Sequence, residues 1–215
     1  MTREAATGPG RDCARCVRLV KFRGLQRKAH AEWHNAPVPS FGSLRAPLLI
    51  VGLAPGLRGA NRTGRPFTGD YAGDLLYATL GKYGFARGDY AASADDGLVL
   101  VGCRVSNAVR CVPPENKPLP AEIAACRPFL AAEIDAMRNL TVILALGRIA
   151  HDAVLAALAQ KKSAFAFRHG AIHQLVDGPM LADSYHCSRY NTNTGKLTAT
   201  MFEAVFRELR RLVVL

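Results

Sequence analysis

Short, uninterrupted apolar runs recur along the chain, separated by longer segments of mixed character. They are "LLIVGL" (48–53), "GLVLVGCRVSN" (97–107) and "LTVILALG" (140–147), followed by "AIHQLV" (171–176) and "PMLADSYH" (179–186). Runs of this length are typical of strands, and a strand that is apolar throughout is buried on both faces. The pattern therefore predicts a sheet of three strands, with one or two more near the C-terminal end, covered on both sides.

Helical periodicity fills most of the segments between these runs. Helices are predicted over 74–84, 121–137 with a bend or break at Pro128, 148–160 and 197–212, with one or two more within 13–34. Strand and helix alternate, which predicts an α/β fold with a parallel sheet and helices on both faces. At 215 residues the whole chain, 1–215, is expected to form one domain, with 1–12 as a flexible N-terminus.

The charge of the chain adds a partner to this picture. Lysine and arginine number 28 against 17 aspartates and glutamates, which gives a formal net charge of +11. Such an excess favours a polyanion such as nucleic acid, and a basic surface that only maintains solubility is the alternative. The N-terminus lacks an apolar signal segment and no apolar run approaches membrane length. We therefore expect a cytoplasmic protein that does not enter a membrane.

Three loops carry the candidate functional residues, and each begins where a predicted strand ends. They start after Val51, after Val105 and after Tyr185. In parallel sheets, ligands bind beyond the carboxyl ends of the strands, so these loops are expected to converge on one cleft. The first loop, Gly52 to Tyr77, contains six glycines, and a loop of this length inside a compact domain usually binds something.

Two side chains of the first loop are candidates for chemistry and for stacking. Asp70 is its first carboxylate and the better candidate for acid–base work, although a helix N-cap is the alternative. Asp74 fits the first turn of the following helix, where the helix dipole stabilises its charge. Phe67 offers a flat ring that can stack on a base, and its alternative is a core residue beneath the loop.

The other two loops contribute an amide and an imidazole. Asn107 ends a strand and can donate and accept hydrogen bonds at once, which suits the edge of a pyrimidine; a turn residue is the alternative. His186 opens the polar loop "HCSRYNTNTGKLT" (186–198), where it is either a cleft residue or a structural histidine. The asparagines, threonines and glycine of that loop suit phosphate contacts.

Six cysteines occur, and four of them form a spaced set. Cys13 and Cys16 form a CxxC pair, and Cys111 and Cys126 flank a proline-rich segment. Four thiolates can hold zinc or a [4Fe–4S] cluster, and the spacing leaves these two open; simple core packing of the second pair is the further alternative. Cys103 is expected to be a buried apolar residue.

Three motifs of the chain resemble those of a known family. "GLAPGLRGANRTGRPFTGD", "SNAVRCVPPENKP" and "HCSRYNTNTGKLT", in this order and with the four cysteines, resemble the uracil-DNA glycosylase superfamily, most closely its iron–sulfur branch called family 5 or type B. The resemblance runs from about Cys13 to the last helix. Other iron–sulfur glycosylases carry a glutamate after the first glycine of the opening motif, where this chain has Leu53 and Ala54, the type B pattern.

The resemblance implies a fold, a cofactor and roles for individual residues. The fold would be a three-layer α/β/α sandwich around a four-stranded parallel sheet. Phe67 would stack on an extruded base, Asn107 would read its edge, His186 would donate to its O2 carbonyl, and Asp70 would activate water. A [4Fe–4S] cluster would be held by Cys13, Cys16, Cys111 and Cys126.

Further contacts are expected around this centre. The base pocket is expected to include the backbone of Gly52, Ala54, Pro55 and Gly56. DNA contacts are expected from Arg62, Arg65, Ser188, Arg189 and Asn191. The implied activity is that of a monomeric, monofunctional DNA glycosylase in base excision repair. It would release uracil, and also hypoxanthine and xanthine, from double-stranded DNA and leave an abasic site.

Two other functions are kept as alternatives. A non-catalytic nucleic-acid-binding module with zinc or an iron–sulfur cluster would also explain the charge and the cysteines. A hydrolase that uses Cys187 and His186 as a thiol–imidazole pair is weaker, because neighbours on extended backbone point to opposite sides.

Overall fold

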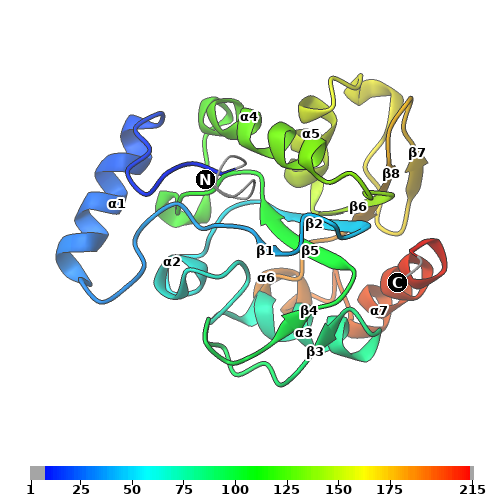
Figure 1. Ribbon diagram of the computed structural model, residues 1–215, viewed down its shortest axis with the longest axis horizontal. Coiled ribbons are helices and arrows are strands. Elements are labelled where there is room, and N and C mark those ends of the chain that lie inside the picture. Colours follow the sequence, from blue (N-terminus) through cyan, green and yellow to red (C-terminus); the bar gives the residue numbers. More distant parts are fainter. Residues whose placement is uncertain (1–7, 214–215) are drawn as a thin grey trace.

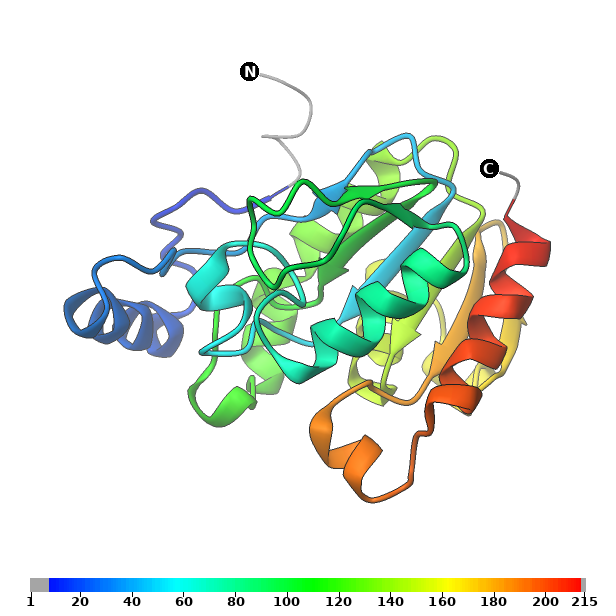
Figure 2. The same ribbon diagram turned by 90° about the horizontal axis from the view of Figure 1, so that it is seen from below.

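A central sheet is covered by helices on both faces in the computed structural model, which describes residues 8–213 (Figures 1 and 2). The strands of this sheet lie in the order β1-β5-β2-β6-β8-β7. Their bounds are β1 Phe41–Gly42, β2 Leu48–Gly52, β5 Cys103–Asn107, β6 Val142–Leu146, β7 Ile172–Gln174 and β8 Met180–Ser184. Strands β5, β2, β6 and β8 are parallel, whereas β1 and β7 pair antiparallel at the edges. The four-stranded parallel sheet is therefore confirmed, with one short strand added at each edge.

Successive residues of the central strands face opposite layers, which places a core on each side of the sheet. Leu48 and Ile50 of β2 pack with α3 (Tyr71–Lys82) and α7 (Ala199–Leu212), whereas Leu49 and Val51 pack with α4 (Pro120–Ala136) and α5 (Arg148–Ala157). Figure 2 shows α3 and α7 lying across one face of the sheet. The predicted three-layer α/β/α arrangement is therefore confirmed.

The remaining elements lie outside these three layers. They are α1 (Val17–Ala29), α2 (Ala60–Thr63), α6 (Arg189–Asn193), the 3-10 turns η2 (Pro114–Asn116) and η3 (Lys162–Ala164), and a two-stranded sheet of β3 (Ala86–Arg87) and β4 (Val99–Leu100). Figure 1 shows α1 beside the sheet, near one end of α4. Arg18 of α1 donates to both carboxylate oxygens of Glu122 in α4, at 2.8 and 2.7 Å, and so fastens the two helices together.

Several predicted element bounds were wrong, each for a local reason. The run 97–107 is two strands, because Gly102 adopts a φ of +62° and separates β4 from β5. Helix α4 runs through Pro128 without a break, and the exposed proline lies on its outer face. Helix α3 begins three residues before position 74, because Asp70 caps it. The short helices α2 and α6 lie inside predicted loops, whereas the single helix α1 within 13–34 agrees with the prediction of one or two helices there.

The predicted flexible N-terminus at 1–12 is only partly open to description. Residues 1–7 lie outside the described residues. Asp12 accepts a hydrogen bond from Arg27 at 2.7 Å, and the carbonyl of Arg11 accepts another from the same guanidinium at 3.2 Å. Residues 11 and 12 are thus held against α1 rather than free. Among the described helices, none has the length and apolar character that crossing a bilayer requires.

Candidate functional site

The three strand-end loops converge on one cleft, as the sequence predicted. Gly52 and Asn107 are directly paired across β2 and β5, at the carboxyl ends of both strands. His186 follows the end of β8 by two residues. A cleft of about 730 Å³ opens at this edge of the sheet. Its lining includes the predicted residues Ala54, Pro55, Gly56, Phe67, Asp70, Asn107, His186, Ser188 and Arg189.

Gly52 lies at the floor of this site, where two side chains close over its backbone. A Cβ at position 52 would lie 2.4 Å from Cζ of Phe67 and 2.6 Å from Oδ1 of Asn107. Phe67 itself has a φ of +52°, in the left-handed region that few phenylalanines adopt. Only glycine therefore lets the ring and the amide meet over the strand end, and the first loop is strained where it presents the ring.

Asn107 ends a strand that a buried network fixes, and its side chain keeps hydrogen-bonding capacity. Its side chain is buried, and Oδ1 has no hydrogen-bond partner among the described residues. The preceding Ser106 donates to Glu133 of α4 at 2.7 Å, and Glu133 is also bound by Arg104 and Arg110. This network fixes the end of β5. An amide that is buried, fixed and without a partner for its oxygen is suited to a ligand.

His186 faces Phe67 across the cleft and is electrically neutral. The two ring centroids are 5.9 Å apart, with an angle of 28° between the ring planes. Burial lowers the pKa of His186 to about 4, so at neutral pH the ring carries one N–H that can donate. The side-chain amide of Asn191 donates to the His186 carbonyl at 2.8 Å and holds this part of the loop. Asn191 thus supports the imidazole from behind.

Asp70 both caps a helix and lines the cleft. Its Oδ1 accepts from the backbone N–H of Gly73 at 3.1 Å, which is the N-cap role that the sequence left open. Its Oδ2 faces the glycine-rich loop, where a Cβ at Gly56 would lie 2.9 Å away. Burial raises the pKa of Asp70, and the charge of Asp74 raises it further. Asp74 is exposed in the first turn of α3, as predicted, and does not line the cleft.

The residues predicted to contact DNA divide into two groups. Arg62 and Arg189 are exposed, and the Arg189 guanidinium lies 5.4 Å from the ring centroid of Tyr71. Ser188 caps α6 by accepting from the backbone N–H of Asn191 at 3.4 Å. These side chains lie on or beside the cleft surface.

Arg65 disagrees with the prediction. Its side chain is buried, and its two terminal nitrogens donate to the carboxylate of Asp96 at 2.7 and 2.6 Å. The same guanidinium packs on the rings of Phe41 and Tyr77. Arg65 is therefore a core residue that fixes the loop carrying Phe67, and a phosphate cannot reach it. The residues next to Arg65 in the sequence do not indicate this ion pair, because Asp96 lies 31 residues away.

Other cleft residues were not singled out from the sequence. Tyr71 and Asn116 line the cleft, and so does Tyr190, which is 74% exposed at its rim. Asn116 lies in the segment that follows β5. Asn116 could therefore have been predicted as a cleft residue from the rule that loops at strand ends bind ligands.

The thiol–imidazole alternative is not supported by the geometry. Cys187 is fully buried in the core beneath α3, and its Sγ donates to the carbonyl of Ala72 at 3.4 Å. Burial raises the pKa of this thiol, which opposes formation of a thiolate. His186 lines the cleft instead, so the two side chains face different surroundings. Cys103 is likewise buried in the core, as predicted.

The four remaining cysteines come together on the side of the sheet where α1 lies. Cys13, Cys16, Cys111 and Cys126 line one small cavity. Cys111 and Cys126 are buried, and burial raises the pKa of the Cys111 thiol to about 11. Arg23 donates to Cys111 Sγ at 3.3 Å, and the backbone N–H of Arg110 points at Cys126 Sγ at 3.4 Å. Donors aimed at sulfur favour thiolates, the form that binds metal.

The four sulfurs are not gathered as the ligands of a single ion would be. Thiolates around one zinc ion lie about 3.8 Å apart, given Zn–S bonds of about 2.3 Å in a tetrahedron. Among the described residues no three of the four sulfurs lie within 4.8 Å of one another. Four cysteines around one cavity are compatible with an iron–sulfur cluster.

Comparison with known proteins gives a consistent result. A family model described as the uracil DNA glycosylase superfamily matches residues 39–210. A type-5 uracil-DNA glycosylase from Thermus thermophilus is 46% identical over 217 residues, covering 99% of each chain. Type-5 uracil-DNA glycosylases from Mycobacterium bovis and Pyrobaculum aerophilum are 42% and 39% identical, covering 93% and 91% of this chain and 78% and 87% of those proteins.

Proposed function

Because this chain belongs to the uracil-DNA glycosylase superfamily, we propose that it is a monofunctional DNA glycosylase that hydrolyses the N-glycosidic bond of uracil in double-stranded DNA. The observation that carries the proposal is the cleft at the strand ends. It gathers an aromatic ring, a buried amide with an unpartnered oxygen, a neutral imidazole and a carboxylate around one space.

Recognition of the base is the first step that these residues explain. The target nucleotide has to leave the stack, which costs a few kcal/mol and is easiest for mispaired bases such as uracil opposite guanine. Phe67 then stacks on the base, and the amide of Asn107 pairs with its O4 and N3–H edge. The Ser106–Glu133 network holds the end of β5, which carries Asn107, in place before the base arrives, so little ordering of the strand end is left for the binding step.

Bond cleavage needs stabilisation of opposite charges at its two ends. The base departs with negative charge on its carbonyl oxygens, and the neutral His186 ring donates to O2; one such donor is typically worth about 3 kcal/mol. The sugar becomes cationic, and the carboxylate of Asp70 stabilises it and orients the attacking water. Asp70 has to be ionised to stabilise the cationic sugar. His186 has to be neutral, and burial keeps the His186 ring neutral because it lowers the pKa of that ring.

We assign the four-cysteine set to a [4Fe–4S] cluster, held by Cys13, Cys16, Cys111 and Cys126. When bound, the cluster is a structural centre that braces α1 and α4 against the loop after β5. That loop runs from Asn107 to Cys111, so the brace lies four residues from the base-reading amide. No chemical step on the sugar or base is assigned to it.

DNA binding and cellular setting follow from the same surface. The net charge of +11 supplies sequence-independent phosphate binding, with Arg62 and Arg189 beside the cleft, and affinity for DNA should fall steeply as the salt concentration rises.

Because one chain supplies every residue of the cleft, we expect a single domain that acts as a monomer. Its substrate places it at the nucleoid in the cytoplasm. We also propose that hypoxanthine and xanthine are released, since the pocket reads base edges that these purines share in part.

Duplexes that carry one U, hypoxanthine or xanthine test this proposal directly. Purified protein is mixed in excess with each duplex, and free base and abasic sites are quantified over time. Release of uracil from a U·G duplex is expected, with release of the two purines at their own rates. Stable binding to DNA without release of uracil at any salt concentration would contradict the proposal and favour a non-catalytic binding module.

A further inference from the structure

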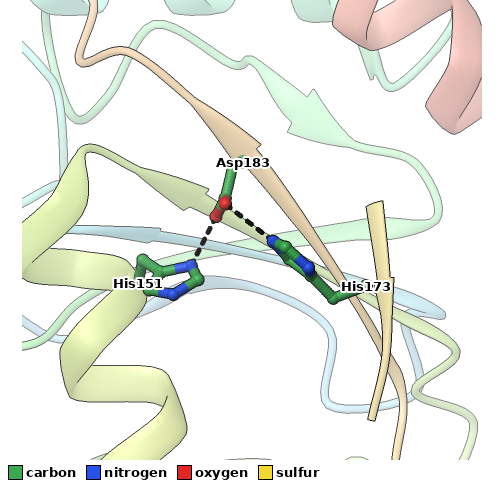
Figure 3. A group of neighbouring side chains, drawn as sticks. All are labelled: His151, His173 and Asp183. Atoms are coloured by element: carbon green, nitrogen blue, oxygen red, sulfur yellow. Dashed lines mark hydrogen bonds and ion pairs between the residues drawn. The ribbon is translucent and has the colours of Figure 1, made fainter. Parts of the chain in front are cut away.

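A second cluster of ionisable side chains lies away from the cleft, between α5 and the edge of the sheet. Asp183 on β8 stands between two imidazoles, from His151 on α5 and His173 on β7 (Figure 3). Its Oδ1 lies 2.7 Å from Nδ1 of His151, and its Oδ2 lies 3.1 Å from Nε2 of His173. None of the three residues lines the cleft.

Hydrogen bonds of His151 hold this cluster together when no ligand is bound. His151 Nε2 lies 2.9 Å from the carbonyl of Phe165, and its Nδ1 faces the carboxylate. Both partners can accept hydrogen bonds, so the ring satisfies both contacts in the form in which both nitrogens carry a proton, which is positively charged. The hydrogen bond to Asp183 raises the pKa of His151, against the effect of burial. In that form the proton on His151 Nδ1 balances the charge of the buried carboxylate, and a metal ion can take the place of this proton.

We propose that His151, His173 and Asp183 form a binding site for a divalent transition metal, with Zn²⁺ as the best-matched ion. The coordinating atoms would be Nδ1 of His151, Nε2 of His173 and one carboxylate oxygen of Asp183. One ligand atom from each of the three residues lies within 4.8 Å of the ligand atoms of the other two. Two imidazoles and one carboxylate are a ligand set that zinc accepts, with a fourth position left for water.

The three ligand atoms are close enough for one ion after small side-chain shifts. Zinc–nitrogen and zinc–oxygen bonds of about 2.0–2.2 Å place tetrahedral ligands about 3.3 Å apart. His151 and His173 now contact different oxygens of the carboxylate, at 2.7 and 3.1 Å, so a rotation of the Asp183 carboxylate and movement of the rings would bring one oxygen and both nitrogens around the ion. The three ligands come from a helix and two paired strands, which fixes their mutual positions. Binding would displace the proton from His151 Nδ1 and any proton on His173 Nε2 into solvent.

The surroundings are those of a metal site in two further respects. The second nitrogen of His151 donates to a backbone carbonyl, the arrangement that commonly orients a metal-ligating histidine, and the backbone N–H of Arg168 points at Asp183 Oδ2 at 3.3 Å. Phe165 and Phe167 pack against the imidazoles and limit water. The side chain of His173 is 17% exposed whereas those of its two partners are buried, so an ion can enter from that side.

Zinc binding and X-ray absorption test the proposal on tag-free, full-length, iron-loaded protein. The protein is dialysed against buffered Zn²⁺, zinc and iron are measured per chain, and the zinc absorption edge identifies the ligands. We expect one zinc per chain with a nitrogen/oxygen shell at about 2.0 Å. The His173→Gln variant should weaken zinc affinity about tenfold or more and should remove the zinc-induced rise in the thermal unfolding midpoint. His30→Gln, at the end of α1, is the matched control and should change neither.

The result does not depend on catalysis and so is separable from the proposed function. No zinc above background in the wild-type protein would overturn the site. So would a sulfur shell at about 2.3 Å, which would place the ion among the cysteines. Equal zinc affinity in the wild-type protein and in His173→Gln would also exclude these ligands. The wild-type measurements decide the matter even if the variant is unstable.

Discussion

The cleft and the four-cysteine set differ in where their residues lie and in how those residues are surrounded. The cleft draws on residues at strand ends, and it leaves polar groups with hydrogen-bonding capacity, such as Asn107 Oδ1. The cysteine set draws on three distant segments and buries its later pair in an apolar cluster with Leu19 and Val109. A change in the cleft should therefore impair chemistry and spare the fold. A change in the cysteine set should impair the fold of that side and reduce the reaction rate less than a change in the cleft does.

The largest effect is expected from Asp70→Asn. The amide still caps α3 but cannot stabilise a cationic sugar or accept a proton, so we expect the single-turnover rate to fall by about 10²–10⁴-fold. The thermal unfolding midpoint should change little. The matched control is Asp74→Asn, which alters the exposed carboxylate four residues on and should keep the rate within about twofold at neutral pH. Equal losses in the two variants would remove the special role of Asp70.

A smaller loss is expected when the floor of the cleft is filled. In Gly52→Ala the added methyl meets the Phe67 ring and the Asn107 amide, and both must move. Displacement of a recognition group by about 1 Å can cost about 10²-fold in rate, so we expect a loss of that order. Gly81→Ala, where no atom lies within 4 Å of the added carbon, is the control. A rate for Gly52→Ala that matches this control would show that the close approach has no bearing on catalysis.

The cysteine set is separated from the cleft by comparing Cys126→Ala with Cys103→Ala. Cys126 lines the four-cysteine cavity, whereas Cys103 lies in the core of the sheet. We expect Cys126→Ala to lose its iron and to unfold about 5 °C lower or more, with a rate loss smaller than that of Asp70→Asn in the protein that remains folded. Cys103→Ala should keep its iron. Full iron content in Cys126→Ala would refute the ligand assignment.

The smallest expected effect concerns pH. Burial and the charge of Asp74 raise the pKa of Asp70, so activity should fall on the acid side at a pH above the ordinary aspartate value of 3.8. Falling pH protonates Asp70 and removes its negative charge. Asp74→Asn removes one cause of the raised pKa and should shift this acid limb to lower pH. Rates measured from pH 4 to 8 in both proteins check the shift; coincident limbs would mean that another group titrates.

Much of the fold could be predicted, because strands and helices carry local patterns. The continuous runs at 48–53 and 140–147 became central strands, and the amphipathic stripe at 197–212 became α7. The run 171–176 contains the edge strand β7, whereas the edge strand β1 is only two residues long, which is too short for a periodic signal. The break at Gly102 depends on its positive φ, and helix α4 continues through Pro128, which is exposed on its outer face.

The cleft could be predicted because the topology of a parallel sheet places it. The buried contacts that hold the cleft residues could not be predicted. Asn107 and His186 follow strands whose ends must meet in a parallel sheet. The burial of Arg65 depends on Asp96, and the rigidity of Ser106 depends on Glu133, 27 residues later. Long-range side-chain contacts of this kind leave no local pattern. The His151–Asp183–His173 cluster was missed for the same reason, since its members are spread over three elements.

Base extrusion can be measured in the inactive protein and tests the central claim most directly. A U·G duplex is prepared with 2-aminopurine next to the uracil, and Asp70→Asn protein is titrated into it. If Phe67, Asn107 and His186 together hold one extruded nucleotide, the fluorescence of 2-aminopurine should rise as its stacking partner leaves. Asn107→Ala in the same background should reduce that rise. Saturated binding with no change in fluorescence would contradict a cleft that takes up a nucleotide from the helix.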